Sequence, residues 1–377
     1  MNRPHAWVAS LLLVGGLNSA ALIAQDFQFK PSVDIREPST RLLSDITSTG
    51  AALVAVGERG LILQKAAADE AWAQAQVPVS AALTAISFPT ESLGWAVGHA
   101  GVILHSNDAG ASWSIQFDGN EANTQWLAYT QQQFAEMEAR VATLTSEGDP
   151  EGLLPDLEYA LEDAQFNLED AEAAIETGPA DPMLDVLFTN ANEGWAVGAY
   201  GMIYHTKNGG EDWTLAADRV NNPDRYHFYA IASDEAGNLY LSGEAGLLFH
   251  SNDNGISWTR NEDVYIGSLF GLASRGSDVY AFGLRGNIFH SQDAGTSWAA
   301  VSNPTAFSLY GGNTLDDGNL LLVGAGGGTL LLGPDNQIRT NTQPSRKTLS
   351  GAAQDTAGKI TLVGMEGVEM LAEQEGE

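Results

Sequence analysis

Cysteine is absent from the 377 residues of this sequence, and basic residues are scarce. The first absence excludes disulfides, thiolate metal sites and catalysis by a cysteine nucleophile. Lys and Arg number 17 against 48 Asp and Glu, so the formal net charge is −31. A field of this sign keeps a protein soluble and repels nucleic acid and anionic membrane surfaces. Nucleic-acid partners and strongly anionic ligands are therefore disfavoured.

Long apolar runs are also lacking, except near the N-terminus. There Arg3 precedes an apolar stretch over residues 6–24 that ends in small residues. This pattern is typical of a secretory signal peptide over residues 1–24, cleaved near Ala24. The stretch is just long enough to stay as a membrane anchor instead. We expect an exported protein, periplasmic if the source is a Gram-negative bacterium.

Glycine is abundant, and pairs of glycines separated by two residues recur along the chain. The first members of these G-x-x-G pairs stand at steps of 41, 100, 45, 40, 41 and 40 residues. They are Gly57, Gly98, Gly198, Gly243, Gly283, Gly324 and Gly364. A period near 40 residues with strand-like content indicates the blades of a β-propeller. The sequence thus predicts an all-β, seven-bladed β-propeller of four-stranded blades over residues 27–372, followed by an acidic tail at 373–377.

Each repeat divides into four expected strands, with G-x-x-G as the turn between the second and third. We expect these glycines to supply the positive φ angles of a tight hairpin turn. The last repeat lacks a fourth strand before the sequence ends. The segment FQFKPSV (27–33) is predicted to supply it, which would close the ring with strands from both chain ends and remove an exposed edge.

The step of 100 residues contains an insertion over residues 119–181, between the second and third blades. Two helices are expected there, at about 121–146 and 152–177. Apolar residues recur at alternating steps of three and four along both, and indicate an antiparallel coiled-coil hairpin. The stripes are Leu127, Thr130, Phe134, Met137, Val141 and Leu144, then Leu154, Leu157, Leu161, Ala164, Leu168, Ala171 and Ile175. The outer face is acidic, and is either a solvated surface or a partner-binding surface.

The order of the strands predicts which turns lie on which face of the propeller. In a four-stranded meander, the turn between strands 2 and 3 lies at the same end as the link to the next blade. The G-x-x-G turns and the hairpin therefore share one face, which is the expected partner-binding face. The candidate residues in the turns are Arg59, His99, Tyr200, Glu244, Arg285 and Glu366. Those on the hairpin are Glu158, Glu162, Glu169 and Asp170.

An eight-residue motif occurs four times between strands 3 and 4: SNDAGASW (106–113), TKNGGEDW (206–213), SNDNGISW (251–258) and SQDAGTSW (291–298). It matches the Asp-box pattern, in which a short Asp side chain accepts backbone N–H bonds within its own turn. We interpret it as structural and on the face opposite the G-x-x-G turns. Its key residues are Asp108, Trp113, Asn208, Trp213, Asp253, Trp258, Asp293 and Trp298.

Catalytic and metal-binding interpretations find little support. Asp boxes occur in sialidases, but the Arg-Ile-Pro signature of that family is absent, and the net charge would repel an anionic sugar. His105, His205, His250 and His290 occupy equivalent positions in four different blades, too far apart to share one metal ion. We therefore predict no catalytic residue, no metal and no cofactor.

The repeat G-W-A-V-G-x-x-G-x-I-x-H-[ST]-x-[DN]-x-G-x-x-W resembles the photosystem II stability/assembly factor family and its bacterial relatives. The resemblance covers roughly residues 40–372 without the helical insertion, and is strongest at 94–113 and 194–213. It implies a non-catalytic propeller that assists the assembly of a membrane protein complex, plausibly an inner-membrane exporter of the resistance–nodulation–division class. Membrane association would come through that partner or an uncleaved signal. The alternative is a sialidase-like glycoside hydrolase or a carbohydrate-binding propeller.

Overall fold

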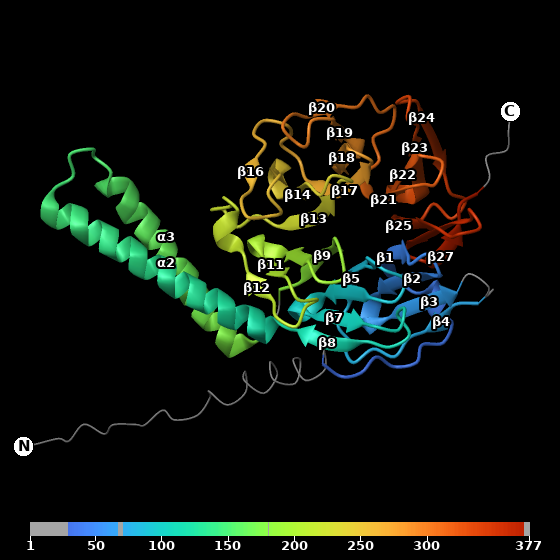
Figure 1. Ribbon diagram of the computed structural model, residues 1–377, viewed down its shortest axis with the longest axis horizontal. Helices are drawn as coiled ribbons and strands as arrows, with labels where there is room; N and C mark the ends of the chain where they lie inside the picture. Colours follow the sequence, from blue (N-terminus) through green and yellow to red (C-terminus); the bar gives the residue numbers. More distant parts are fainter. Residues whose placement is uncertain (1–28, 67–70, 180, 373–377) are drawn as a thin grey trace, which may run out of the picture.

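The computed structural model describes residues 29–66, 71–179 and 181–372. The predicted signal peptide and the acidic tail at 373–377 lie outside these residues. Seven antiparallel sheets surround a common axis, and Figure 1 shows their first strands gathered around the centre. Each first strand contacts the first strand of the next sheet, and β1 contacts β25, so the ring is closed. The predicted all-β, seven-bladed propeller with two inserted helices is confirmed.

Six blades have four strands in sequence order. Blade 1 contains β1 (Leu43–Ser48), β2 (Ala52–Gly57), β3 (Ile62–Ala66) and β4 (Ala73–Gln74). Blade 2 contains β5 (Leu83–Ser87), β6 (Gly94–Gly98), β7 (Ile103–Ser106) and β8 (Ser114–Phe117). Blade 3 contains β9 (Met183–Phe188), β10 (Gly194–Gly198), β11 (Ile203–Thr206) and β12 (Thr214–Leu215).

The second half of the ring repeats this order. Blade 4 contains β13 (Phe228–Ser233), β14 (Leu239–Gly243), β15 (Leu248–Ser251) and β16 (Thr259–Arg260). Blade 5 contains β17 (Leu269–Arg275), β18 (Asp278–Gly283), β19 (Ile288–Ser291) and β20 (Ala299–Ala300). Blade 6 contains β21 (Leu309–Thr314), β22 (Leu320–Gly324), β23 (Gly328–Leu332) and β24 (Ile338–Thr342). Strands after the Asp boxes begin one residue beyond the tryptophan, not at it.

Blade 7 has only three strands, β25 (Leu349–Gln354), β26 (Ile360–Gly364) and β27 (Gly367–Met370). The predicted closure by an N-terminal fourth strand is wrong for the described residues. The Ser32 N–H donates to the Val77 O at 2.9 Å, and Ile35 and Val33 bond the Gln74 side chain. Residues 29–35 thus lie along blade 1. The ring is closed instead by packing of the blade 7 sheet against the blade 1 sheet. Leu43 and Ile46 of β1 share a buried cluster with Ala353 and Val363 of blade 7.

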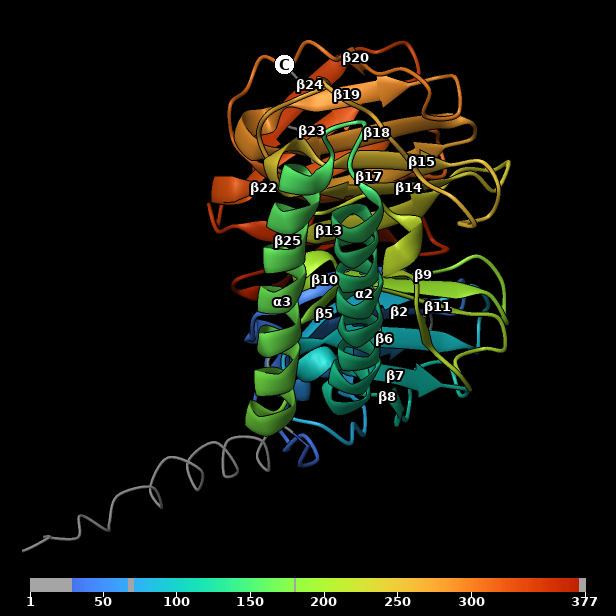
Figure 2. The same ribbon diagram turned by 90° about the vertical axis from the view of Figure 1, so that its left-hand side faces the viewer.

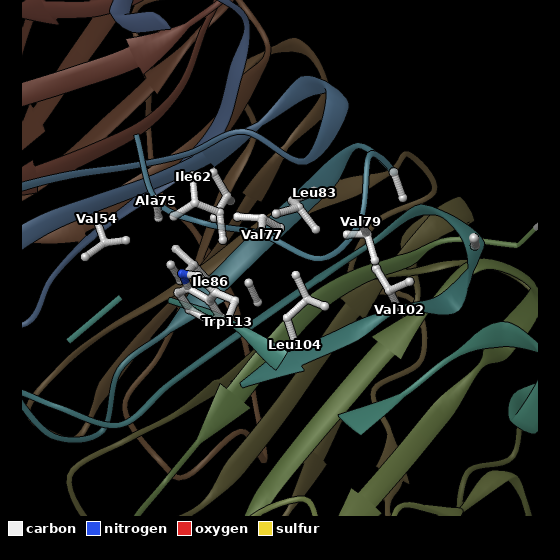
Figure 3. Packing of buried hydrophobic residues seen from close by; sticks show 14 residues of the cluster. Val54, Ile62, Ala75, Val77, Val79, Leu83, Ile86, Val102, Leu104 and Trp113 are labelled. Carbon is white, nitrogen blue, oxygen red and sulfur yellow. The ribbon is translucent and has the colours of Figure 1, made fainter. Parts of the chain in front are cut away.

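Large apolar side chains fill the spaces between adjacent blades. In blades 2, 4 and 5 the tryptophan before the fourth strand packs onto the second strand of the preceding blade. Figure 3 shows Trp113 of blade 2 among Val54 and Ile62 of blade 1 and Leu104 of its own blade. In the same way Trp258 meets Trp195 at 6.0 Å between ring centroids, and Trp298 meets Tyr240 at 6.3 Å. These contacts form buried apolar clusters between adjacent blades, which hold the turns at fixed positions.

The inserted helices are α2 (Gly119–Glu147) and α3 (Leu154–Thr177). Asp118 caps α2 by accepting hydrogen bonds from the N–H groups of Asn120 and Glu121, and Gly148 and Gly178 end the two helices with positive φ. The helices pack on each other, and Figures 1 and 2 show them leaving the rim of the ring together. The coiled-coil character of this pair stays a prediction.

The burial pattern of the helices agrees with the predicted stripes at all positions but one. Ile175 is 45% exposed, and Ala174 takes the inward position instead. The reason is the hairpin base, where the side-chain amide of Asn123 donates to the Ala174 carbonyl at 2.9 Å and fixes the last turn of α3. A strict alternation of three and four residues does not predict this change of the inward position from Ile175 to Ala174.

Candidate binding surface

The G-x-x-G turns form short 3-10 turns: η2 (Glu58–Gly60), η3 (His99–Gly101), η4 (Ala199–Gly201), η6 (Glu244–Gly246), η7 (Leu284–Gly286) and η8 (Ala325–Gly327). The expectation that both glycines supply positive φ is half wrong. The second glycine does, as at Gly201 with φ 75°. The first is extended, and a Cβ there would meet the carbonyl oxygen before the inner strand, at 2.2 Å for Gly98 and Ala82. Close backbone approach requires that glycine.

Positive φ also falls on the residue before the second glycine. Arg59, Tyr200 and Arg285, three of the predicted binding residues, have φ between 53° and 58°. Left-handed backbone is unfavourable for residues with a Cβ, and it aims these side chains outward from the turn. The scaffold therefore presents a constrained large side chain on this face in blades 1, 3 and 5.

The hairpin shares this face, as strand order predicts. A Cβ added to Gly101 in η3 would lie 2.8 Å from the Gly119 Cα at the start of α2. The Tyr204 hydroxyl donates to the Ala122 carbonyl, and the Gln125 side chain bonds the Trp213 carbonyl and the Leu215 N–H. The base of α2 is thus fixed to blade 3 beside two G-x-x-G turns.

Three predicted residues, Tyr200, Glu244 and Asp170, are brought together here. The link is made by Arg225 and His227, which sequence reasoning missed. The Tyr200 N–H donates to His227 Nδ1 at 2.7 Å, and the His227 N–H donates to the Glu244 carboxylate at 3.3 Å. Arg225 Nη1 lies 3.4 Å from the Asp170 carboxylate on α3. One cluster thereby joins the hairpin to blades 3 and 4.

The other predicted residues lie apart from this cluster. Arg59, His99 and Arg285 are exposed in the turns of blades 1, 2 and 5, and Glu366 of blade 7 forms an ion pair with Lys347 at 2.9 Å. Glu158, Glu162 and Glu169 are exposed on α3. Contacts between side chains are therefore unevenly distributed over the ring face, and they are concentrated at blades 3 to 6.

A groove of about 470 Å³ lies between the hairpin base and the link from blade 3 to blade 4. Its walls include Trp126 and Tyr129 of α2, Tyr200, and Arg225 in the link. The Arg225 guanidinium lies over the Trp126 ring at 4.7 Å and the Tyr200 ring at 5.8 Å. Trp126 Nε1 and Arg225 Nε are buried and have no hydrogen-bond partner among the described residues. Two donors are thus free at an aromatic, cationic groove.

Aromatic rings continue from the groove to the mouth of the central channel. His227 contacts Tyr229 at 6.2 Å between ring centroids, Tyr229 contacts Phe270 at 5.4 Å, and Phe270 contacts Tyr310 at 5.5 Å. We call this row the aromatic arc; its members are Trp126, Arg225, Tyr200, His227, Tyr229, Phe270 and Tyr310. It spans five elements, α2, η4, β13, β17 and β21, together with the link before β13, and its rings form one contiguous row.

The arc owes its position to a bulge that recurs in every inner strand. Strand pairing shifts register after the first residue, as between Phe228 and Ala230, so the second residue stands outside the ladder. In blades 4, 5 and 6 this residue is aromatic. In blades 2 and 7 it is Thr84 or Ser350, whose hydroxyls bond the first strand of the next blade at 2.8 Å. The sequence therefore did contain a signal for the aromatic arc: in three consecutive repeats the second residue of the first strand is aromatic.

Two half-buried aspartates bind adjacent blades to each other. Asp45 accepts the N–H groups of Ile46 and Ile86, and Asp185 accepts those of Val186 and Ile231. Burial raises the pKa of Asp45 to about 6 and that of Asp185 to about 7, although the backbone donors act in the opposite direction. Sequence reasoning missed both.

The Asp boxes are self-contained turns. In blade 4 the Asp253 carboxylate accepts from Ser251 Oγ, from the Ser257 N–H and from Ser257 Oγ. The Ser257 hydroxyl is the main reason that the pKa of Asp253 falls to about 2. Asp108 and Asp293 repeat this pattern, and Asn208 bonds Thr206 and Asp212. The carboxylates are thus committed to their own turns.

The four histidines before the boxes pack or bond within their blades. The His205 ring stacks on Trp195 at 3.8 Å, His290 stacks on Tyr280 at 4.3 Å, and His250 Nδ1 lies 3.0 Å from the Asn261 side chain. Across the described residues no three His, Asp or Glu side chains gather as a metal site. Nor does a helix in this part of the chain have the length and apolarity to span a membrane.

Comparison with protein families gives one match. The family model of the photosynthesis system II assembly factor YCF48 matches residues 56–143 and 169–350, which is more than half of the chain. The unmatched gap falls within the helical hairpin. No curated protein matches the sequence.

Solved structures show the same fold at low sequence identity. YCF48 bound to D1 peptide is 14% identical with a TM-score of 0.57, over 91% of this chain and 100% of that one. YCF48 from Cyanidioschyzon merolae is 15% identical with a TM-score of 0.56, over 89% and 96%. A streptogramin B lyase is 11% identical with a TM-score of 0.55, over 90% and 95%. Since an enzyme is among these structures, the fold alone does not decide whether the chain is catalytic.

Proposed function

This chain belongs to the family of the photosystem II assembly factor YCF48, and from that premise we propose that it is a non-catalytic assembly factor that holds an extended segment of a membrane protein. The segment would lie along the aromatic arc, with one end in the groove at the hairpin base. The structure titled YCF48 bound to D1 peptide supports a peptide as the ligand class.

The observation that carries this proposal is the continuity of the arc. Aromatic rings and an arginine supply large contact area at little conformational cost, and they are the residues that dominate binding energy in protein interfaces.

The place and partner of action follow from the sequence expectations. We propose that residues 1–24 direct export, that the propeller works in the periplasm of a Gram-negative cell, and that the partner is an inner-membrane complex such as a resistance–nodulation–division exporter. The hairpin, about 40 Å long at 1.5 Å per residue, would extend the contact beyond the ring. Its exposed acidic face, with Glu158, Glu162 and Glu169, favours a basic surface on that partner.

The experiment is capture of the partner from detergent-solubilised membranes, quantified by mass spectrometry. Phe270→Ser and Tyr310→Ser should each reduce capture at least about tenfold, because each removes an aromatic contact of about 1.5–3 kcal/mol from the mouth. Ile256→Ser is the matched control, since Ile256 is 67% exposed in an Asp box and should leave capture unchanged.

Equal capture by all three variants would refute the arc as the binding surface. Hydrolysis of any member of a glycoside panel, lost on replacing Tyr200 or Glu244, would refute the non-catalytic assignment.

A further inference from the structure

Blade 7 is the one incomplete blade in the described part of the ring, and its open edge adjoins a cavity of about 520 Å³. The walls are Leu321, Thr329 and Leu331 of blade 6 and Ile360, Met370 and Leu371 of blade 7. Arg339 and Lys359 are exposed at its rim. This site lies outside the aromatic arc and has no part in the proposed function.

The sister blades show what belongs in such a cavity. The residue three positions before the first G-x-x-G glycine receives the tryptophan region of the next blade. Val54 receives the region around Trp113, Trp195 receives that of Trp258, and Tyr240 receives that of Trp298. The equivalent residue of blade 6 is Leu321, which faces the cavity. The cavity is thus the vacant place of a tryptophan and a fourth strand.

The backbone of β27 is free to pair on this side. The Leu371 N–H donates to the Ile360 carbonyl, so Leu371 belongs to a hydrogen-bonded pair of the antiparallel ladder. Alternation then turns the N–H and C=O groups of Val368 and Met370 away from β26. Met370 corresponds to His105 in blade 2, because each pairs with the residue three positions before the first glycine of its turn, and His105 pairs with Ser114 of the fourth strand β8.

We propose that this edge binds an extended segment of another protein by strand addition, with one large aromatic side chain in the cavity and acidic residues beside Arg339 and Lys359. Backbone pairing would supply affinity and the cavity would supply selectivity. Two unpaired cations in a chain of net charge −31 favour an acidic segment, and neither forms an ion pair with a described residue.

Two segments of this chain, residues 29–35 and 373–377, do not match the cavity. The sequence after Ala372, EQEGE, has no apolar residue to fill the cavity. Residues 29–35 run along blade 1 and pair with Val77 and Gln74. Neither of these two segments fills the cavity, which leaves it open to a segment from another polypeptide.

The test uses a labelled peptide with the sequence of residues 108–117, DAGASWSIQF, which is a tryptophan and fourth strand of blade 2. Fluorescence anisotropy with the full chain should show saturable binding, weakened at least tenfold by Trp113→Ala within the peptide. Two variants of the protein should also lose it. Leu331→Trp fills the cavity, and Val368→Pro removes an outward N–H without breaking the ladder.

Charge is tested separately. Lys359→Glu should weaken binding several-fold, whereas Lys207→Glu, the same change on exposed Lys207 of blade 3, should not. Absence of saturable binding, or equal binding by Leu331→Trp and Val368→Pro, overturns the proposal. Binding that emerges only after residues 1–28 or 373–377 are removed also overturns it, and assigns the site to this chain's own terminus. Partner capture through the aromatic arc is measured independently, so the two proposals fail separately.

Discussion

At the scale of single residues, the ring face is built from backbone conformations that most side chains avoid. Each G-x-x-G turn needs one glycine for close approach and a second for positive φ, and in blades 1 to 6 the residue before the second glycine is also left-handed. Where that residue is arginine or tyrosine, the left-handed backbone conformation is unfavourable, and it places a large side chain on the ring face. Such outliers are tolerated because the surrounding strands fix the turn.

Arg59→Gly should therefore stabilise the protein by about 1 kcal/mol, because glycine adopts φ 56° without a Cβ clash. Chemical denaturation measures the change. Arg36→Gly is the control, since Arg36 is equally exposed but does not have positive φ, and should be neutral or slightly destabilising. A loss of stability in Arg59→Gly would mean that the arginine makes a contact worth more than its strain.

At the scale of elements, the hairpin is an addition to the ring and not a part of its core. Its two ends lie side by side, as a Cβ on Gly119 would stand 2.4 Å from the Pro179 Cβ. Contacts with the ring are confined to the base, through Gln125, Arg225 and Tyr204. The blade contacts that close the ring do not pass through either helix.

Replacing residues 119–178 by a Gly-Ser-Gly linker should leave a folded propeller. The helical signal in circular dichroism should disappear, while Tm falls by only a few degrees. The loss of Trp126 also opens the groove, so partner capture should fall at least about tenfold. A variant that captures the partner unchanged would show that the hairpin has no role in binding, and one that is insoluble would show that the blades depend on it.

At the scale of the whole molecule, blades are joined by tryptophans in the core and by hydrogen bonds near the axis. Asp45 joins blade 1 to blade 2, and Asp185 joins blade 3 to blade 4. Both carboxyls have a pKa in the folded state above the ordinary value of 3.8. The folded chain therefore holds protons at these sites over a range where the unfolded chain has released them.

The free energy of unfolding should fall as pH rises from about 4 to about 7, and these two groups should add no further change above that. The contribution is on the order of 3 kcal/mol per group. Denaturation curves at several pH values measure it, and the Asp45→Asn/Asp185→Asn double variant should lack this part of the slope. An unchanged slope in the double variant would assign it to other carboxylates.

The sequence by itself determined the number of blades, their strand order, the place of the hairpin and the face that it shares with the G-x-x-G turns. These follow from periodicity and from the alternation of strand directions, which are local properties repeated along the chain. The structural role of the Asp boxes could also be predicted from the sequence, because the Asp108 side chain and its equivalents bond within their own eight residues.

The tertiary structure alone decided how the ring closes and where its surface is organised. Residues 29–35 could have paired with β27 by sequence pattern, but their hydrogen bonds go to blade 1. Tyr229, Phe270 and Tyr310 look like ordinary strand residues until the inner-strand bulges bring them into contact from three blades. These contacts join residues about 40 positions apart in neighbouring blades. They depend on how the blades pack around the axis, which no local sequence pattern encodes.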